Sequence, residues 1–337
     1  MERITDFEGL EKYLQAKPNS TKVIISDENT TEHCLGGLIM GVDALLSAQI
    51  IEIPSGEQAK SLETYQSVIE ALIEQGCDRN TTLIALGGGV VCDVVGFVAG
   101  TFKRGISSCY VPTTTLAMVD AAIGGKCGLD IGTVKNQIGL FYPAEVVCIE
   151  PEFTDTLDER QIKNGAVEML KTFLIADREL AIKMLGMPVS EAAKDPSLIR
   201  SCMAIKQEIV KQDMFDKGKR QLLNFGHTFG HAIESLAMQQ GRDTLHGEAV
   251  AQGIYHVLSL SESLDKAERD LIADYLCNNY IIEPIKEDLP LLFNYMNADK
   301  KNTDNKYNFV LLDAIGKARH SCQFQADQLL AIFDKLD

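Results

Sequence analysis

Residues 81–102 read TTLIALGGGVVCDVVGFVAGTF, and this stretch determines the fold class expected for the first half of the chain. The apolar run TTLIAL predicts a buried strand, the glycines at 87–89 a tight turn, and the segment after them a helix. This order directs backbone N–H groups and the positive end of the helix dipole at a phosphate. Cys92 stands where the G-x-G-x-x-G fingerprint requires its last glycine. A dinucleotide site and a plain strand–helix turn therefore both remain open.

Strand signals on both sides of this stretch predict a parallel α/β sheet. A helical pattern over about 59–75 lies between two of them, and the strands are expected at 22–26, 48–53, 107–111 and 145–150. Open parallel sheets bind ligands beyond the carboxyl ends of their strands. Polar residues follow three of these strands, at 27–31, at Glu57 and Lys60, and at Thr113 and Thr114, where a threonine would also suit an ordinary helix N-cap. We expect a Rossmann-like nucleotide-binding domain over residues 1–150.

Helical periodicity dominates after residue 150 and predicts an all-α domain over residues 151–337. In the helix expected at about 156–175, Asn164, Glu168 and Lys171 follow one another at i, i+4 and i+7 and so share one stripe. Another helix is expected at about 197–213 and carries Lys206, and a strand is expected from YNFVLL near the C-terminus. Glu168 is a candidate metal ligand, and a solvated Asn–Glu–Lys pairing is the structural alternative.

Three of the six histidines fall in LLNFGHTFGHAIESLAMQQGRDTLHGE, residues 222–248. The spacing predicts one helix on which Asn224, His227 and His231 share a face, and His246 follows. Histidines at i and i+4 suit a zinc site, although the H-E-x-x-H motif is absent, and satisfied polar residues at an interface would give the same pattern. The glycines within the row predict that another segment packs very close.

Composition excludes several function classes. The chain has 337 residues and a formal net charge of −16, which argues against a nucleic-acid or anionic membrane surface. Nine cysteines without a CxxC pair indicate neither a zinc knuckle nor a thioredoxin-like motif, and they suit a reducing cytoplasm. No signal peptide or membrane span is expected. Lys126 and Lys135 lie in an apolar, glycine-rich run, which predicts local binding of an anionic substrate.

An ordered set of motifs then adds a family resemblance. GGGVVCD, KRG, VPTTTLAMVD, GGK, KNQIG, NGAVEMLK, LLNFGHTFGHAIE, LHGEAVA and DKK occur in this order over most of the chain. The set resembles the 3-dehydroquinate synthases, a branch of the sugar-phosphate cyclase family in the shikimate pathway. The resemblance implies a homodimer with a Rossmann-like domain, a helical domain and an active site in the cleft between them. It also implies NAD and Zn²⁺ or Co²⁺ as cofactors and a phosphorylated sugar acid as substrate.

The resemblance assigns roles position by position. The metal ligands correspond to Glu168, His227 and His246, whereas His231 corresponds to a residue on the substrate side. The cofactor-binding positions are Asp27, Asn29, Glu57, Lys60, Gly88, Gly89, Asp93, Thr113, Thr114, Lys126, Lys135 and Thr154. The catalytic positions are Asp120, Lys126, Lys171, Lys206, Arg220 and His231, and the other substrate contacts are Arg104, Lys135, Asn136, Asn224, Lys300 and Lys301.

The sequence departs from the usual family pattern at Cys92, at Ala121 and Ala122, at Cys127, in LDIGTVKN and at Val167. None of these departures removes a charged catalytic group. The alternatives are a 2-epi-5-epi-valiolone or 2-deoxy-scyllo-inosose synthase, a metal-dependent polyol dehydrogenase, and a non-catalytic nucleotide-binding protein.

Overall fold

The computed structural model describes residues 2–132, 134–298 and 306–335. The chain divides into two compact units, Met1–Asp158 and Glu159–Asp337, and each is described by itself. The predicted Lys300 and Lys301 lie outside the described residues. In the part that is described, no helix is long and apolar enough to cross a membrane.

The first unit is built on a six-stranded parallel sheet in the order β1-β8-β5-β4-β2-β3. From β2 the chain moves outward to β3, then returns to β4 on the other side of β2 and continues through β5 to β8. The direction of winding therefore reverses between β2 and β4, which is where such sheets form their ligand crevice. The strands are β1 (Arg3–Thr5), β2 (Lys22–Asp27), β3 (Gln49–Ile53), β4 (Thr82–Gly87), β5 (Ser107–Pro112) and β8 (Val146–Cys148).

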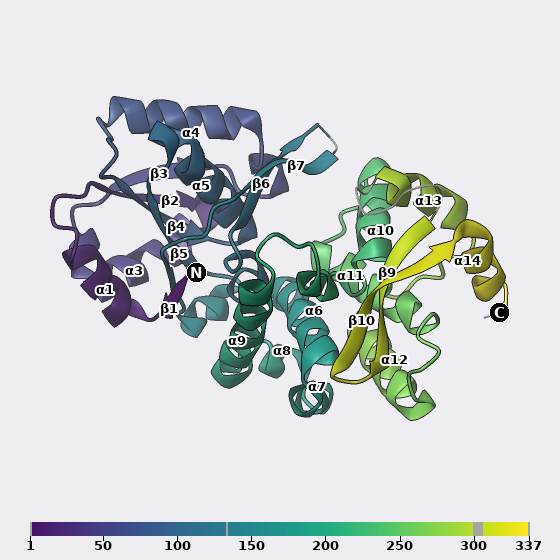
Figure 1. Ribbon diagram of the computed structural model, residues 1–337. Helices are drawn as coiled ribbons and strands as arrows, with labels where there is room; N and C mark the ends of the chain where they lie inside the picture. The colour runs from purple at the N-terminus through teal and green to yellow at the C-terminus, as the bar shows by residue number, and fades with distance from the viewer. Residues whose placement is uncertain (1, 133, 299–305, 336–337) are drawn as a thin grey trace. The chain divides into compact units, whose positions relative to one another are not determined.

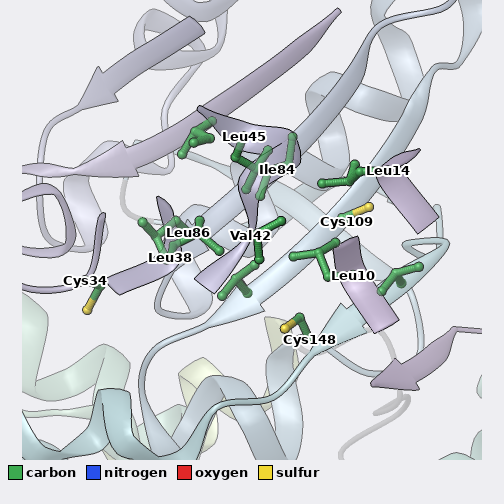
Figure 2. Close-up of a cluster of buried hydrophobic side chains, with 13 residues drawn as sticks. Leu10, Leu14, Cys34, Leu38, Val42, Leu45, Ile84, Leu86, Cys109 and Cys148 are labelled. Carbon is green, nitrogen blue, oxygen red and sulfur yellow. The ribbon is translucent and has the colours of Figure 1, made fainter. Parts of the chain in front are cut away.

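Helices cover both faces of this sheet, as Figure 1 shows: α1 (Phe7–Gln15) and α3 (Leu35–Gly41) lie on one face, α4 (Leu62–Glu74) and α5 (Gly89–Thr101) on the other. Alternate residues of a strand point to opposite faces. Ile84 and Leu86 accordingly join Leu10 and Leu14 of α1 in one buried apolar cluster (Figure 2). A short helix, α2 (Glu28–His33), follows β2 directly. The parallel α/β domain expected from the sequence is confirmed.

An antiparallel hairpin of β6 (Lys126–Ile131) and β7 (Val134–Phe141) was not expected from the sequence. Its glycines lack the side chains that give a strand its alternating pattern. The pairing nevertheless depends on them, because a Cβ on Gly128 would lie 2.6 Å from the carbonyl oxygen of Ile138. The Asp130 N–H donates a hydrogen bond of 2.8 Å to the Lys60 carbonyl oxygen and fixes this hairpin to the loop that follows β3.

The second unit is mainly helical and centres on α6 (Glu159–Ala176), in which residues 164–175 are all buried. A helix that is buried on every side forms the core of its domain, and α7, α8, α9 and α11 all pack against it. The bounds are α7 (Arg178–Leu185), α8 (Val189–Ala192), α9 (Pro196–Gln212), α10 (His227–Gln239), α11 (His246–Leu258), α12 (Lys266–Asn279), α13 (Leu289–Ala298) and α14 (Ala326–Phe333).

The helical second domain is confirmed with one addition, because the unit is not all-α. It contains an antiparallel hairpin of β9 (Lys306–Ala314) and β10 (Lys317–Gln325). The YNFVLL strand expected from the sequence is β9. In β10 every second residue is exposed and its sequence, KARHSCQFQ, is largely polar, which hides the strand from a search for apolar runs.

The histidine stretch is not one continuous helix, and this corrects the prediction that Asn224 shares a helical face with His227 and His231. A 3₁₀ segment, η6 (Lys219–Asn224), ends before Phe225, and Gly226 has φ = +78°. That left-handed conformation favours glycine and breaks the helix, so α10 begins at His227. The predicted close packing is confirmed, because a Cβ on Gly226 would lie 2.9 Å from the Ile254 nitrogen of α11.

Candidate functional site

Three predicted metal ligands converge within the second unit. Glu168 of α6, His227 at the start of α10 and His246 at the start of α11 bring their ligand atoms within 4.8 Å of one another. Glu168 Oε1 lies 3.4 Å from His227 Nε2 and 3.3 Å from His246 Nε2. Two imidazoles and one carboxylate around a common point form the ligand set of catalytic zinc sites, which leave one position open for substrate.

The far side of each imidazole also has a partner. His227 Nδ1 lies 3.1 Å from the Phe225 carbonyl oxygen, and His246 Nδ1 lies 3.5 Å from Glu234 Oε2. Ligand histidines in metal sites usually donate the second ring N–H to a carbonyl or carboxylate oxygen in this way. When each ring donates its Nδ1–H to this partner, the Nε2 lone pair remains on the side of the ring that faces Glu168. A metal held between the three side chains could bind that lone pair.

Burial and charge within the triad also suit a cation. Glu168 is fully buried, and burial raises its pKa, but Lys171 and the two histidines outweigh this effect and hold the pKa well below its usual range. Burial lowers the pKa of His227 well below its usual value. Burial acts in the same direction on His246, but the two flanking carboxylates raise its pKa to about 10. Neither Glu168 oxygen accepts a hydrogen bond of regular geometry from a residue that the structure describes, although Lys171 forms an ion pair with it. These residues fit a divalent metal ion.

Residues on successive turns of α6 contact the start of α11 and so position His246. Arg160 lies two turns before Glu168, and its guanidinium donates to Glu248 Oε1 at 2.6 Å and to Asp243 Oδ2 at 2.6 Å. One turn further on, Asn164 Oδ1 accepts a hydrogen bond of 2.6 Å from the Gly247 N–H. Residues on successive turns of α6 therefore hold the segment on both sides of His246 and bring its ring to Glu168.

The other predicted residues of the second unit surround the triad unevenly. Lys171, Lys206 and Arg220 are buried, whereas His231 is exposed, with its ring centroid 5.1 Å from that of His227. The Arg220 guanidinium donates to the Met214 carbonyl oxygen at 2.7 Å. A small pocket beside the triad is lined by side chains of η6, α10 and the β9–β10 hairpin, among them Asn224, His227, His231, Asn308, His320 and Ser321.

The predicted nucleotide contacts lie at the carboxyl edge of the parallel sheet. Asp27 ends β2, Gly88 and Gly89 follow β4, and Thr113 and Thr114 follow β5. Two of these residues also have roles within the chain: Asp27 Oδ1 caps α2 by accepting from the Thr30 N–H at 2.8 Å, and Thr114 Oγ1 accepts from the Ala117 N–H at 3.1 Å. Beyond β8, Thr154 Oγ1 donates to the Pro151 carbonyl oxygen at 2.7 Å, and Asn29 lies in the first turn of α2.

The glycine turn leaves room for a phosphate. Gly87 is required by the fold itself, because a Cβ there would lie 2.4 Å from Val91 Cγ2. A Cβ on Gly88 would lie 3.4 Å from the Thr114 methyl group, which is an ordinary contact. The chain's own packing therefore does not require a glycine at 88, whereas close approach of a phosphate to the backbone at the start of α5 would require one. This turn fits a dinucleotide.

Charged residues predicted for cofactor and for substrate form one network beside this edge. Lys60 is buried, and its Nζ lies 2.8 Å from Asp93 Oδ2 and donates to Asn136 Oδ1 at 2.8 Å. Lys135 Nζ lies 3.2 Å from Glu57 Oε1. Burial raises the pKa of Asp93 to about 6 although Lys60 opposes the shift, and the neighbouring carboxylates raise the pKa of Lys60 against the effect of its own burial. The β6–β7 hairpin thus brings Lys135 and Asn136 to residues predicted to contact the nucleotide.

The remaining predicted residues of the first unit belong to other elements. Arg104 is exposed and has φ = +69° in the turn between α5 and β5, and Lys126 is exposed at the start of β6. Asp120 lies on a π-helical turn, Ala117–Ala121. Such turns occur frequently at functional sites.

Sequence reasoning missed Glu234, Arg160 and the pocket residues of the hairpin. Glu234 lies seven residues after His227 and three after His231, so helical spacing could have placed it on the same face. No comparable signal marks His320 or Ser321, because a bulge between Arg319 and Cys322 determines where they lie, and Ser321 has φ = +61°.

Solved enzymes with this fold define the general class. The fold matches 2-epi-5-epi-valiolone synthase from Streptomyces hygroscopicus subsp. jinggangensis, solved with NAD⁺ and Zn²⁺, at a TM-score of 0.86 and 25% identity, over 100% of this chain and 97% of that one. It also matches a 2-deoxy-scyllo-inosose synthase, solved with carbaglucose-6-phosphate, NAD⁺ and Co²⁺, at a TM-score of 0.83 and 25% identity, over 98% and 95% of the two chains. The class is therefore that of the two-domain sugar-phosphate cyclases.

Sequence comparison identifies the particular family. Residues 50–164 match the model of the 3-dehydroquinate synthase N-terminal domain, and residues 165–302 match that of the C-terminal domain. The 3-dehydroquinate synthase of Parabacteroides distasonis is 35% identical, over 96% of this chain and 94% of its own length. This chain belongs to the 3-dehydroquinate synthase family, which confirms the resemblance, and it is an enzyme.

Proposed function

We propose that this enzyme is a 3-dehydroquinate synthase, a carbon–oxygen lyase that converts 3-deoxy-D-arabino-heptulosonate 7-phosphate to 3-dehydroquinate and phosphate. The observation that carries the proposal is the convergence of Glu168, His227 and His246, with an oxygen partner behind each imidazole. Family membership supplies the substrate.

The proposal assigns NAD⁺ to the carboxyl edge of the parallel sheet and Zn²⁺ or Co²⁺ to the triad. When bound, the nicotinamide would accept and return a hydride, and the cation would act as a Lewis acid toward the substrate's oxygens. The glycine turn would bind the pyrophosphate through backbone N–H groups at the start of α5. Glu57, Lys60 and Asp93, which ion pairs join into one network, would contact the nucleotide.

Residues of the second unit would bind the anionic groups of the substrate and move protons. Arg220 and Lys206 are buried cations, and a guanidinium can grip a carboxylate or phosphate through two parallel hydrogen bonds. The exposed imidazole of His231 would exchange a proton with the substrate, and Lys171 would polarise the substrate's oxygen from beside Glu168. From the first unit, Asp120 would assist proton transfer. Arg104, Lys126 and Asn136 would bind the phosphate end together with Lys206, and Lys135 would be a further substrate contact.

Two further assignments belong to the proposal. All nine cysteines are free, seven of them buried, which supports a reducing compartment such as the cytoplasm. The proposed enzyme is a homodimer, in line with the family resemblance. The onset of helical periodicity places the proposed boundary between its nucleotide-binding and metal-binding domains near residue 150, shortly before the division of the chain into two compact units after Asp158. Size-exclusion chromatography with light scattering measures the oligomeric state, and a purely monomeric active enzyme would contradict the dimer.

The proposed function is tested by supplying the heptulosonate phosphate together with Zn²⁺ and NAD⁺ far below the substrate concentration. We expect phosphate and 3-dehydroquinate to form in equal amounts, with no net NADH, because the cofactor is regenerated in every cycle. Stoichiometric NADH would instead indicate a polyol dehydrogenase. Turnover of a sugar phosphate without a carboxylate, and none of the heptulosonate, would indicate another cyclase.

A further inference from the structure

His246 lies between two carboxylates that come from different helices. Its Nε2 is 3.3 Å from Glu168 Oε1 of α6, and its Nδ1 is 3.5 Å from Glu234 Oε2 of α10. Glu234 lies two turns into α10, on the helix whose first residue is His227. One helix thus carries a ligand and, seven residues later, the partner of another ligand.

The two ligand histidines are held by different kinds of group. The partner of His227 Nδ1 is the backbone carbonyl of Phe225, which no substitution removes, whereas the partner of His246 Nδ1 is a side chain. A carboxylate partner also makes a ligand imidazole more basic than a carbonyl does, because it carries a full negative charge.

We propose that Glu234 is a positioning residue: it holds the His246 ring so that Nδ1–H points to the carboxylate and Nε2 faces the metal between Glu168 and His227. The proposed role of Glu234 is to orient His246, and it requires no contact between Glu234 and the metal or the substrate. Glu234 is 7% exposed as a residue, and a carboxylate is kept at such a depth only where partners offset the cost of its burial. The inference rests on the metal assignment within the proposed function.

The matched control is Gln252, which is also 7% exposed and lies on α11, the helix of His246. Its Oε1 accepts a hydrogen bond of 3.4 Å from the Glu283 N–H. Glu234→Met and Gln252→Met replace a buried polar side chain by the same apolar one of similar length. Glu234→Gln keeps an acceptor oxygen for Nδ1–H and removes only the charge.

The experiment titrates Co²⁺ into each full-length protein in competition with a chelator and records the visible spectrum of the bound ion. Loss of a partner behind a ligand typically weakens metal binding about 10- to 100-fold. We expect that loss in Glu234→Met, with an altered Co²⁺ spectrum, and an intermediate affinity in Glu234→Gln. Gln252→Met should bind Co²⁺ as the unmodified protein does.

Wild-type affinity and spectrum in folded Glu234→Met would overturn the inference, as would an equal loss in Gln252→Met, because the effect would then be one of packing. If Glu234→Met fails to fold, Glu234→Gln decides, and an unchanged affinity and spectrum there overturn the inference. Absence of Co²⁺ binding by the unmodified protein would instead contradict the metal assignment itself.

Discussion

Gly247 packs against Asn164 so closely that a Cβ on the glycine would lie 2.3 Å from the Asn164 carbonyl oxygen, while the Gly247 N–H donates a hydrogen bond of 2.6 Å to Asn164 Oδ1. Gly247 follows the proposed ligand His246, and Asn164 lies one turn before the proposed ligand Glu168. The distance between these two helices therefore determines whether both ligands can reach one ion.

Gly247→Ala should separate the two helices and weaken the metal site. The contact is with helix backbone, which cannot yield as a flexible side chain does, so we expect a loss of about 1–3 kcal/mol in the free energy of unfolding. Zn²⁺ affinity should fall at least about tenfold, because displaced ligands cannot share an ion. Metal competition and urea unfolding measure the two effects.

The control is Gly36→Ala in α3, where an added Cβ would meet no atom of the described residues within 4 Å. This variant should bind Zn²⁺ normally and gain up to about 1 kcal/mol of stability from the better helix former. Normal metal affinity in folded Gly247→Ala would show that the contact with Asn164 does not position His246.

Gly88→Ala should weaken nucleotide binding and leave the stability of the fold almost unchanged. Its Cβ would make only an ordinary contact with Thr114, and its φ of −72° suits any residue, so stability should change by less than about 0.5 kcal/mol. The added methyl group should nevertheless lower NAD⁺ affinity at least about tenfold by keeping the pyrophosphate from the backbone. Calorimetric titration with NAD⁺ measures this.

The neighbouring Gly87→Ala provides the contrast. Its Cβ would lie 2.4 Å from Val91 Cγ2, and overpacking of this kind costs about 1–3 kcal/mol of stability. Undiminished NAD⁺ affinity in Gly88→Ala would show that NAD⁺ does not bind at this turn.

Stability should depend on pH through His256. Its Nε2–H donates to the Glu283 carbonyl oxygen at 2.9 Å, and burial lowers its pKa to about 4, from 6.5 as a free side chain. Between these values the unfolded chain binds a proton that the folded protein does not, so stability falls as pH falls from about 6.5 toward about 4. The contribution of His256 to this loss is about 2 kcal/mol between about pH 7 and pH 5.

His256→Gln keeps a donor for Glu283 but does not titrate. Urea unfolding of both proteins at pH 7 and pH 5 measures the loss of stability on acidification. We expect the smaller loss in the variant. Equal losses would show that His256 does not account for the pH dependence.

The sequence predicted the parts of this site that depend on local periodicity. Asn164, Glu168 and Lys171 share one stripe of α6 as expected, and the close packing expected from Gly226 and Gly230 occurs. Periodicity failed at Gly226 itself. Its left-handed conformation depends on contact with α11, a segment distant in sequence, so helical spacing alone placed Asn224 on the wrong element.

Contacts between distant segments also explain the residues that were missed. Glu234 and Arg160 matter because they contact a segment, 243–248, that lies next to neither in the sequence. The network around Lys60 likewise requires the β6–β7 hairpin, whose glycines conceal its strands. The resemblance supplied the roles of residues such as Lys135, and the structure shows what each of them contacts.

The most direct test of the central claim is the metal content of the unmodified protein and of His227→Ala, after chelator treatment and addition of Zn²⁺, measured together with phosphate release from the heptulosonate phosphate. We expect one Zn²⁺ per chain and restored turnover in the unmodified protein, and loss of both in a folded His227→Ala. Full phosphate release by metal-free His227→Ala would contradict that claim.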